Sequence, residues 1–194
     1  MAEEGQKYGK DIFSQDLKEG EQWYHELIED GLALSYKVEK VMHRGKSEFQ
    51  EIEVVQTKPF GSLLITDGLM QSSESDEVVY HEALVHPAMT LHECPKRVFI
   101  AGGGEGATLR EVLRHKSVEE CVMVDIDGVL VNEVRKHCKF YNNGAYEDPR
   151  ATLIIGDAKK GLEDYPEESF DVIIMDLSDP LDGGPCYQLY TTSF

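Results

Sequence analysis

The sequence lacks the apolar segments by which proteins enter or cross membranes. No apolar run approaches the roughly 20 residues of a membrane-spanning helix, so we expect no membrane partner. Residues 1–6 have neither the basic part nor the apolar part of a signal peptide. We therefore expect a cytoplasmic protein.

Patterns of metal-binding residues are also scarce. The four cysteines in the 194 residues form no C-x-x-C pair. No histidines show zinc-ligand spacing, and His81 and His86 are five residues apart, which is poor spacing for one face of a helix. We expect no metal site, and free thiols in a reducing compartment.

Basic residues are few for a chain of this length. The sequence has 19 lysines and arginines against 37 aspartates and glutamates, which gives a net charge of -18 at pH 7. Such a surface repels the phosphates of nucleic acids, so we expect no nucleic-acid partner. It attracts cationic ligands, although solubility alone accounts for the larger share of the charge.

The hydrophobic pattern changes once along the chain. Residues 32–41, 52–55 and 62–66 look like strands separated by turns, which predicts a small antiparallel β domain over residues 1–75. From residue 76 a helical pattern begins, and strands at about 96–101, 122–126, 152–155 and 170–175 then alternate with helices. This alternation predicts an α/β domain over residues 76–194, a Rossmann-like parallel sheet of the methyltransferase type with helices on both faces.

A glycine-rich turn follows the first strand of the predicted parallel sheet. Gly102, Gly103, Gly104 and Gly106 let the backbone turn sharply and approach a ligand. The spacing is not G-x-G-x-x-G, so a dinucleotide is disfavoured. Glu105 in the turn would repel phosphate but accept hydrogen bonds from an amine. The alternative is a tight turn needed only for packing.

Acidic residues also end the later strands. Asp125 stands where a carboxylate can accept hydrogen bonds from both ribose hydroxyls, and Asp157 could accept one from an adenine amine. The alternative for each is a helix N-cap; Asp127 is the better cap near Asp125, whereas Asp157 could itself cap the helix from Ala158. With Glu105 and Asp176, every strand end carries a carboxylate, which favours a cationic nucleoside such as a sulfonium.

Asp176 and Asp179 form a pair of carboxylates at the end of the last predicted strand. The pair could hold an ammonium group and remove its proton, which an amine needs before it can attack carbon. An Asx-type turn that closes the strand is an equally good interpretation of this spacing.

Taken together, these motifs resemble the polyamine aminopropyltransferases, the family of spermidine, spermine and thermospermine synthases. The matching stretches are residues 23–24, 47–52, 67–72, 76–82, the glycine turn, 125–127, 156–158 and the Asp176 segment. The Gly-Gly-Gly-Glu-Gly turn together with residues 183–190 looks most like thermospermine synthases.

The resemblance implies an enzyme that transfers an aminopropyl group from decarboxylated S-adenosylmethionine to a polyamine and releases methylthioadenosine. The acceptor would be spermidine, which gives thermospermine or spermine. The donor would be a co-substrate, with no prosthetic group. The resemblance also implies a homo-oligomer, a dimer or tetramer, formed through the N-terminal domain.

The resemblance assigns site residues as well. Asp176 would be the catalytic proton acceptor, and Tyr80, Asp176 and Asp179 would bind the amine acceptor. The donor would be bound by Gln50, His81, Gly102, Gly103, Gly104, Glu105, Asp125, Asp157 and Ala158.

This chain departs from the family pattern in two places. Ser75 stands where the family commonly has an arginine, and the family continues beyond residue 194 through strands and helices that complete the sheet. The C-terminal part of the sheet is therefore expected to be missing. The alternatives are a spermidine synthase acting on putrescine, an S-adenosylmethionine methyltransferase, and an inactive fragment or polyamine-binding module.

Overall fold

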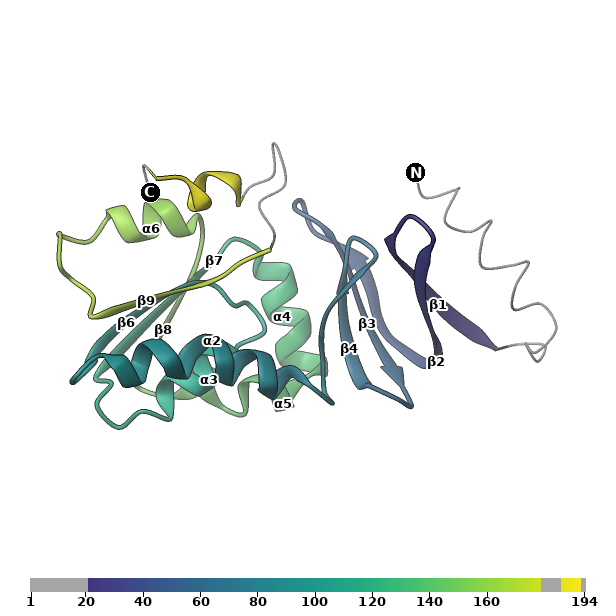
Figure 1. The fold of residues 1–194 in the computed structure, drawn as a ribbon, viewed down its shortest axis with the longest axis horizontal. Coiled ribbons are helices and arrows are strands. Elements are labelled where there is room, and N and C mark those ends of the chain that lie inside the picture. Colours follow the sequence, from purple (N-terminus) through teal and green to yellow (C-terminus); the bar gives the residue numbers. More distant parts are fainter. Residues whose placement is uncertain (1–20, 179–185, 193–194) are drawn as a thin grey trace. The chain divides into compact units, whose positions relative to one another are not determined.

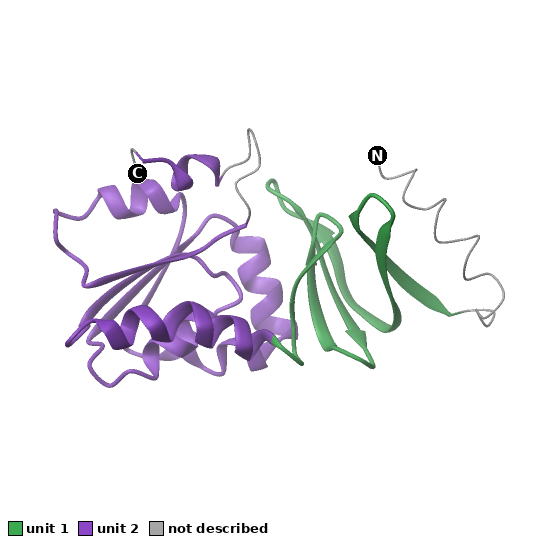
Figure 2. Cartoon of the chain, viewed as in Figure 1, with its two compact units in different colours: residues 1–76 green, residues 77–194 purple. Residues whose placement is uncertain are grey.

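The chain forms two compact units, residues 1–76 and residues 77–194 (Figure 2). The computed structural model describes residues 21–178 and 186–192. Our domain boundary between residues 75 and 76 stays a prediction. No helix within the described ranges is both long and apolar enough to span a membrane.

The first unit is an antiparallel sheet in which the strands follow one another in chain order (Figure 1). Its strands are β1 (Gln22–Glu29), β2 (Leu32–Lys46), β3 (Glu51–Thr57), β4 (Gly61–Thr66) and β5 (Leu69–Ser73). Asp67 and Gly68 both have positive φ, 49° and 83°, as a two-residue hairpin turn requires. The antiparallel sheet was predicted, whereas β1 and β5 were not.

The core of the first unit lies on one face of this sheet. Buried Tyr36, Val55, Leu63 and Ile65 pack together. The ring of Tyr24 stacks on that of Tyr36, with 5.4 Å between the ring centroids. Residues 23–24, one of the stretches that resemble the family, therefore belong to strand β1, which contributes to this core.

The second unit is a parallel sheet of order β8-β7-β6-β9 (Figure 1). The strands are β6 (Arg97–Gly102), β7 (Glu120–Asp125), β8 (Ala151–Ile155) and β9 (Val172–Asp176), and each adjacent pair is parallel. The helices are α2 (Glu77–Leu91), α3 (Ala107–Leu113), α4 (Gly128–His137), α5 (Lys139–Asn142) and α6 (Ala158–Glu163), with the 3-10 turns η1 (Ala145–Glu147) and η2 (Tyr187–Tyr190).

Helices cover both faces of the parallel sheet because alternate strand residues point to opposite sides. Val98 and Ile100 of β6 pack with Val85 of α2 and Leu109 of α3. Phe99 and Ala101 of β6 pack on the other face with Ala158 of α6. The predicted fold class is confirmed, and the carboxyl ends of all four strands lie along one edge of the sheet.

Candidate active site at the carboxyl edge of the parallel sheet

The glycine turn allows the ends of β6 and β9 to approach each other. Gly102 pairs with Asp176 in the parallel ladder, and the backbone N–H of Gly103 donates to the Asp176 carbonyl oxygen at 2.9 Å. Gly102 has a φ of 77°, and a Cβ atom there would overlap the same carbonyl oxygen. The backbone could not adopt this turn with larger residues, so the glycines bring Asp176 beside the turn.

Asp176 is held by hydrogen bonds to both of its carboxylate oxygens. The Tyr80 hydroxyl donates to Oδ1 at 3.2 Å, and the Thr108 hydroxyl donates to Oδ2 at 2.5 Å. Burial and the charge of Glu105 raise the pKa of Asp176, against the opposing effects of Thr108, His81 and Tyr80. A fixed carboxylate with a raised pKa is suited to accept a proton.

His81 lies between two carboxylates in the interior of the second unit. Its Nε2 is 2.8 Å from Oε1 of Glu105, and its Nδ1 is 2.9 Å from Oε2 of Glu77. Nε2 and this oxygen of Glu105 are within ion-pair distance, so a protonated ring would balance the carboxylate. Burial lowers the pKa of His81, but Glu105, Asp176 and the Glu77 carbonyl outweigh it and raise that pKa to about 9.

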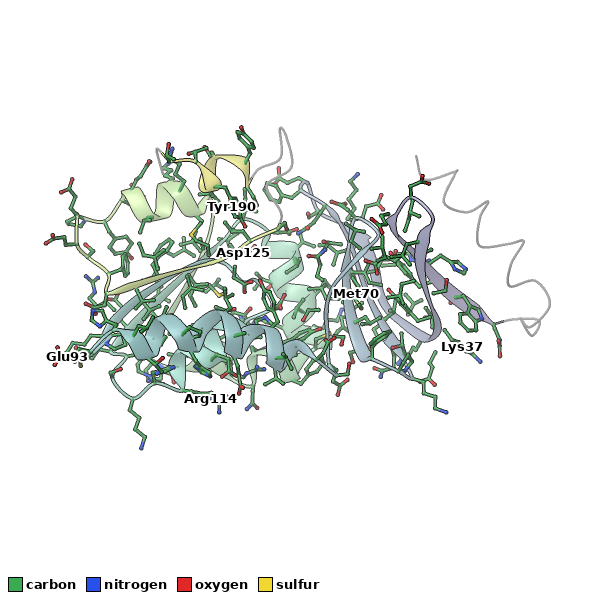
Figure 3. The ribbon with its side chains drawn as sticks, in the orientation of Figure 1. Lys37, Met70, Glu93, Arg114, Asp125 and Tyr190 are labelled. Atoms are coloured by element: carbon green, nitrogen blue, oxygen red, sulfur yellow. The ribbon has the colours of Figure 1, made fainter. Side chains whose placement is uncertain are left out.

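Asp125 lies at the carboxyl end of β7, where Figure 3 labels its side chain. Its Oδ1 accepts the backbone N–H of Asp127 at 2.8 Å. A Cβ atom on Gly104 would come within 2.7 Å of Oδ2, so this glycine also leaves room for the carboxylate. Burial raises the pKa of Asp125 to about 6. Asp127 caps α4, as predicted, by accepting from the N–H groups of Val129 and Leu130.

Asp157 and Ala158 begin α6. One oxygen of Asp157 accepts the backbone N–H groups of Lys159 at 2.8 Å and Lys160 at 3.3 Å, so this side chain is an N-cap. Asp157 is therefore the N-cap of α6, which was the alternative expected from the sequence. Its contact with adenine stays a prediction. Ala158 is buried in the core on the α6 face of the sheet.

Two predicted site residues do not belong to the described part of the second unit. Gln50 belongs to the first unit, where its backbone pairs with Ser47 in the loop between β2 and β3. Asp179 lies outside the described residues. Their roles toward donor and acceptor stay predictions.

Several residues that support the site were not foreseen from the sequence. Thr108 fixes Asp176, and the Tyr146 hydroxyl donates to the Gly104 carbonyl oxygen at 2.7 Å. Arg110 donates to both oxygens of Glu77, each at 2.9 Å. Glu77 could have been found, because it lies four residues before His81 and so on the same face of a helix.

A second group of titratable residues lies on α2 and α3. The potential ligand atoms of Glu82, His86 and Glu111 lie within 4.8 Å of one another. Arg114, labelled in Figure 3, donates to Glu82 at 2.9 Å and to Glu111 at 2.6 Å. A positive charge therefore already lies against both carboxylates, so the group is better described as an ion-pair network.

Comparison with protein families gives two matches. The sequence profile of the spermine/spermidine synthase domain matches residues 77–194. The profile of the spermidine synthase tetramerisation domain matches residues 22–74.

Individual curated proteins are similar over most of this chain. A polyamine aminopropyltransferase of Aeropyrum pernix is 51% identical over 172 residues, which are 89% of this chain and 55% of that protein. The thermospermine synthase ACAULIS5 of Arabidopsis thaliana is 50% identical over 172 residues, 89% of this chain and 50% of that protein. The chain thus spans about half the length of the curated relatives it matches.

Solved structures have the same fold. A crystal structure of spermidine synthase in complex with the transition-state analogue AdoDATO has a TM-score of 0.83 and 36% identity, and the match covers 92% of this chain and 61% of that one. The spermidine synthase from Thermotoga maritima has a TM-score of 0.77 and 36% identity, over 84% and 58% of the two chains.

Proposed function

Because this chain belongs to the spermine/spermidine synthase family, we propose that it is a polyamine aminopropyltransferase. It transfers the aminopropyl group of decarboxylated S-adenosylmethionine to a polyamine and releases methylthioadenosine. The proposed acceptor is spermidine, giving thermospermine or spermine, and the similarity to ACAULIS5 supports this choice. The observation that carries the proposal is the group of Glu105, Asp125 and Asp176 around one glycine turn.

The charge of this group favours a decarboxylated donor. Glu105 lies beside the turn and is balanced by His81, while Asp125 and Asp176 add further negative charge. S-adenosylmethionine would bring its own carboxylate toward these groups and be repelled, whereas the decarboxylated molecule would bring only its ammonium. The charge of this group therefore disfavours the methyltransferase alternative.

The proposed donor site uses the turn and the strand ends. Asp125 accepts hydrogen bonds from the ribose hydroxyls, and the Gly102–Gly104 backbone lies against the nucleoside. Glu105, with His81 beside it, receives the terminal ammonium. Further proposed donor contacts come from Gln50, Asp157 and Ala158.

The proposed chemistry begins with a proton transfer. At neutral pH an amine acceptor is an ammonium ion, which has no lone pair for attack. Asp176 takes the proton, while Tyr80 and Asp179 position the acceptor. The freed nitrogen then forms a bond to the aminopropyl carbon, the carbon–sulfur bond breaks, and its electron pair stays on sulfur as a neutral thioether. The sulfonium is already a good leaving group, so positioning supplies much of the acceleration.

The test is mass spectrometry of the products that the 194-residue chain forms from decarboxylated S-adenosylmethionine with putrescine, agmatine or spermidine. Methylthioadenosine together with thermospermine or spermine supports the proposal. Spermidine formed from putrescine would instead identify a spermidine synthase. Polyamine binding without any product from any amine would overturn the enzymatic proposal and favour a binding module.

Assembly and location are further parts of the proposal. The match of residues 22–74 to a domain named for tetramerisation supports a homo-oligomer, which light scattering on the purified chain would test. The proposed location is the cytoplasm, a reducing compartment in which cysteines stay as thiols. Imaging of a fluorescent fusion would test that location.

A further inference from the structure

A buried pair of opposite charges lies behind the proposed donor-amine site. Glu77 and His81 are one helical turn apart on α2, and their side chains are only 8% and 1% exposed. Arg110 of α3 reaches both oxygens of Glu77 and also donates to the backbone carbonyls of Phe140 and Tyr141. With Glu111 as an additional partner, Arg110 is fixed at several points and fixes Glu77 in turn.

The surroundings of His81 favour its doubly protonated form. Nδ1 faces two acceptors, the Glu77 carbonyl oxygen at 2.6 Å and the Glu77 carboxylate at 2.9 Å, so it carries a hydrogen. Nε2 faces the Glu105 carboxylate at 2.8 Å. The other titratable groups toward the ring are Tyr80 of α2 and Asp176 of β9. A neutral ring would direct a lone pair at one of these carboxylates.

We propose that Glu77, held by Arg110, is a positioning residue that keeps His81 cationic and thereby orients Glu105 toward the ammonium group of the donor. The inference rests on the proposed function, because it concerns the same donor site. Glu77 does not touch the donor; it acts through His81.

In the proposed role, loss of the Glu77 charge takes a proton from His81 and so changes the surroundings of Glu105. In Glu77→Gln the backbone carbonyl oxygen of residue 77 can still accept a hydrogen bond from Nδ1–H of His81. The proton that His81 loses therefore comes from Nε2. The Nε2 lone pair then faces Oε1 of Glu105 and repels it. The positive charge that balances Glu105 and Asp176 disappears at the same time, and Glu105 turns away from the donor amine.

Two ligands separate this role from a general loss of structure. Decarboxylated S-adenosylmethionine carries the aminopropyl ammonium, and methylthioadenosine has the same nucleoside without it. By calorimetry, Glu77→Gln should weaken donor binding about tenfold, since one charge-assisted contact is lost, and change methylthioadenosine binding less than twofold. The matched control is Glu82→Gln, which removes an ion pair of the same helix to an arginine and should change neither affinity.

The protonation state of His81 provides an independent readout. Imidazole ¹⁵N shifts at pH 7.5 should show a cationic His81 in the wild type and a neutral one in Glu77→Gln. If Glu77→Gln does not fold, the variant Arg110→Lys is tested in its place. We expect it to show the same selective loss of donor affinity, with a smaller fold-change. The proposal is overturned by an equal loss for both ligands, by an unchanged or tighter donor affinity, or by a His81 that stays cationic without Glu77.

These outcomes are distinct from a failure of the proposed function. If the wild-type chain binds the donor no better than S-adenosylmethionine, the proposed function fails before any variant is made. If the wild type prefers the decarboxylated donor and Glu77→Gln retains that preference, only the positioning role fails.

Discussion

Replacing Asp176 by asparagine tests the proposed proton acceptor. The substitution keeps the size of the side chain, and its oxygen can still accept the hydrogen bond that the Tyr80 hydroxyl donates to Oδ1. The Thr108 hydroxyl can rotate to accept from the new amide instead of donating to Oδ2. The fold and the glycine turn are therefore expected to persist, and the variant loses the charge and the ability to take a proton.

General-base catalysis contributes roughly 10²- to 10⁴-fold to rate. Asp176→Asn should therefore lower kcat by that factor, which corresponds to about 3 to 5 kcal/mol of transition-state stabilisation. Wild-type kcat should also fall at low pH, as Asp176 becomes protonated through its raised pKa. The variant should lack this acidic limb, because the side chain of residue 176 no longer titrates.

The assay is methylthioadenosine release at saturating donor and amine, measured from pH 5 to 9, together with donor binding by calorimetry. The matched control is Asp171→Asn at the opposite end of β9, where the carboxylate accepts the backbone N–H groups of Lys96 and Arg97. That variant should keep its kcat. An Asp176→Asn enzyme with a near-normal rate and an unchanged acidic limb would refute the assignment.

The remaining predictions concern the groups around the turn. Thr108→Val removes a hydrogen bond that lowers the pKa of Asp176, so the acidic limb of the kcat profile should move to higher pH; a limb that stays in place would contradict the contact. Asp125→Asn should raise the free energy of unfolding at pH 7 by roughly 3 kcal/mol, because the native state no longer contains this buried charge. The folded pKa of Asp125 lies near 6, above its ordinary value of 3.8, so this gain should shrink as pH falls from about 6 to about 4, as urea titrations at several pH values would show. Asp127→Ala should cost about 1 kcal/mol through loss of the α4 cap, measured as a lower urea midpoint at pH 7.

The edge of the sheet was the part of the site most open to prediction from sequence. Strands alternating with helices imply a parallel sheet, and the carboxyl ends of parallel strands meet along one edge. Asp125 and Asp176 each end a strand, and Glu105 lies in the turn that follows one, so the sequence alone allows these carboxylates to be grouped. The Asp127 cap was predictable for a similar reason, because capping is local in sequence.

Contacts between helices were not predictable in this way. The pairing of Arg110 with Glu77 depends on how α3 packs against α2, and Thr108 reaches Asp176 only because the turn brings β9 beside α3. The edge strand β1 was missed because charged and aromatic residues interrupt its alternation. His81 was assigned by resemblance alone, since a single histidine on a helix gives no functional signal of its own.

The proposed function depends most on the donor having no carboxylate. Calorimetry of the wild-type chain with decarboxylated S-adenosylmethionine and with S-adenosylmethionine, under identical conditions, measures this directly. The arrangement of Glu105, Asp125 and Asp176 predicts at least tenfold tighter binding of the decarboxylated molecule, about 1.4 kcal/mol. Equal affinities, or tighter binding of S-adenosylmethionine, would contradict the account.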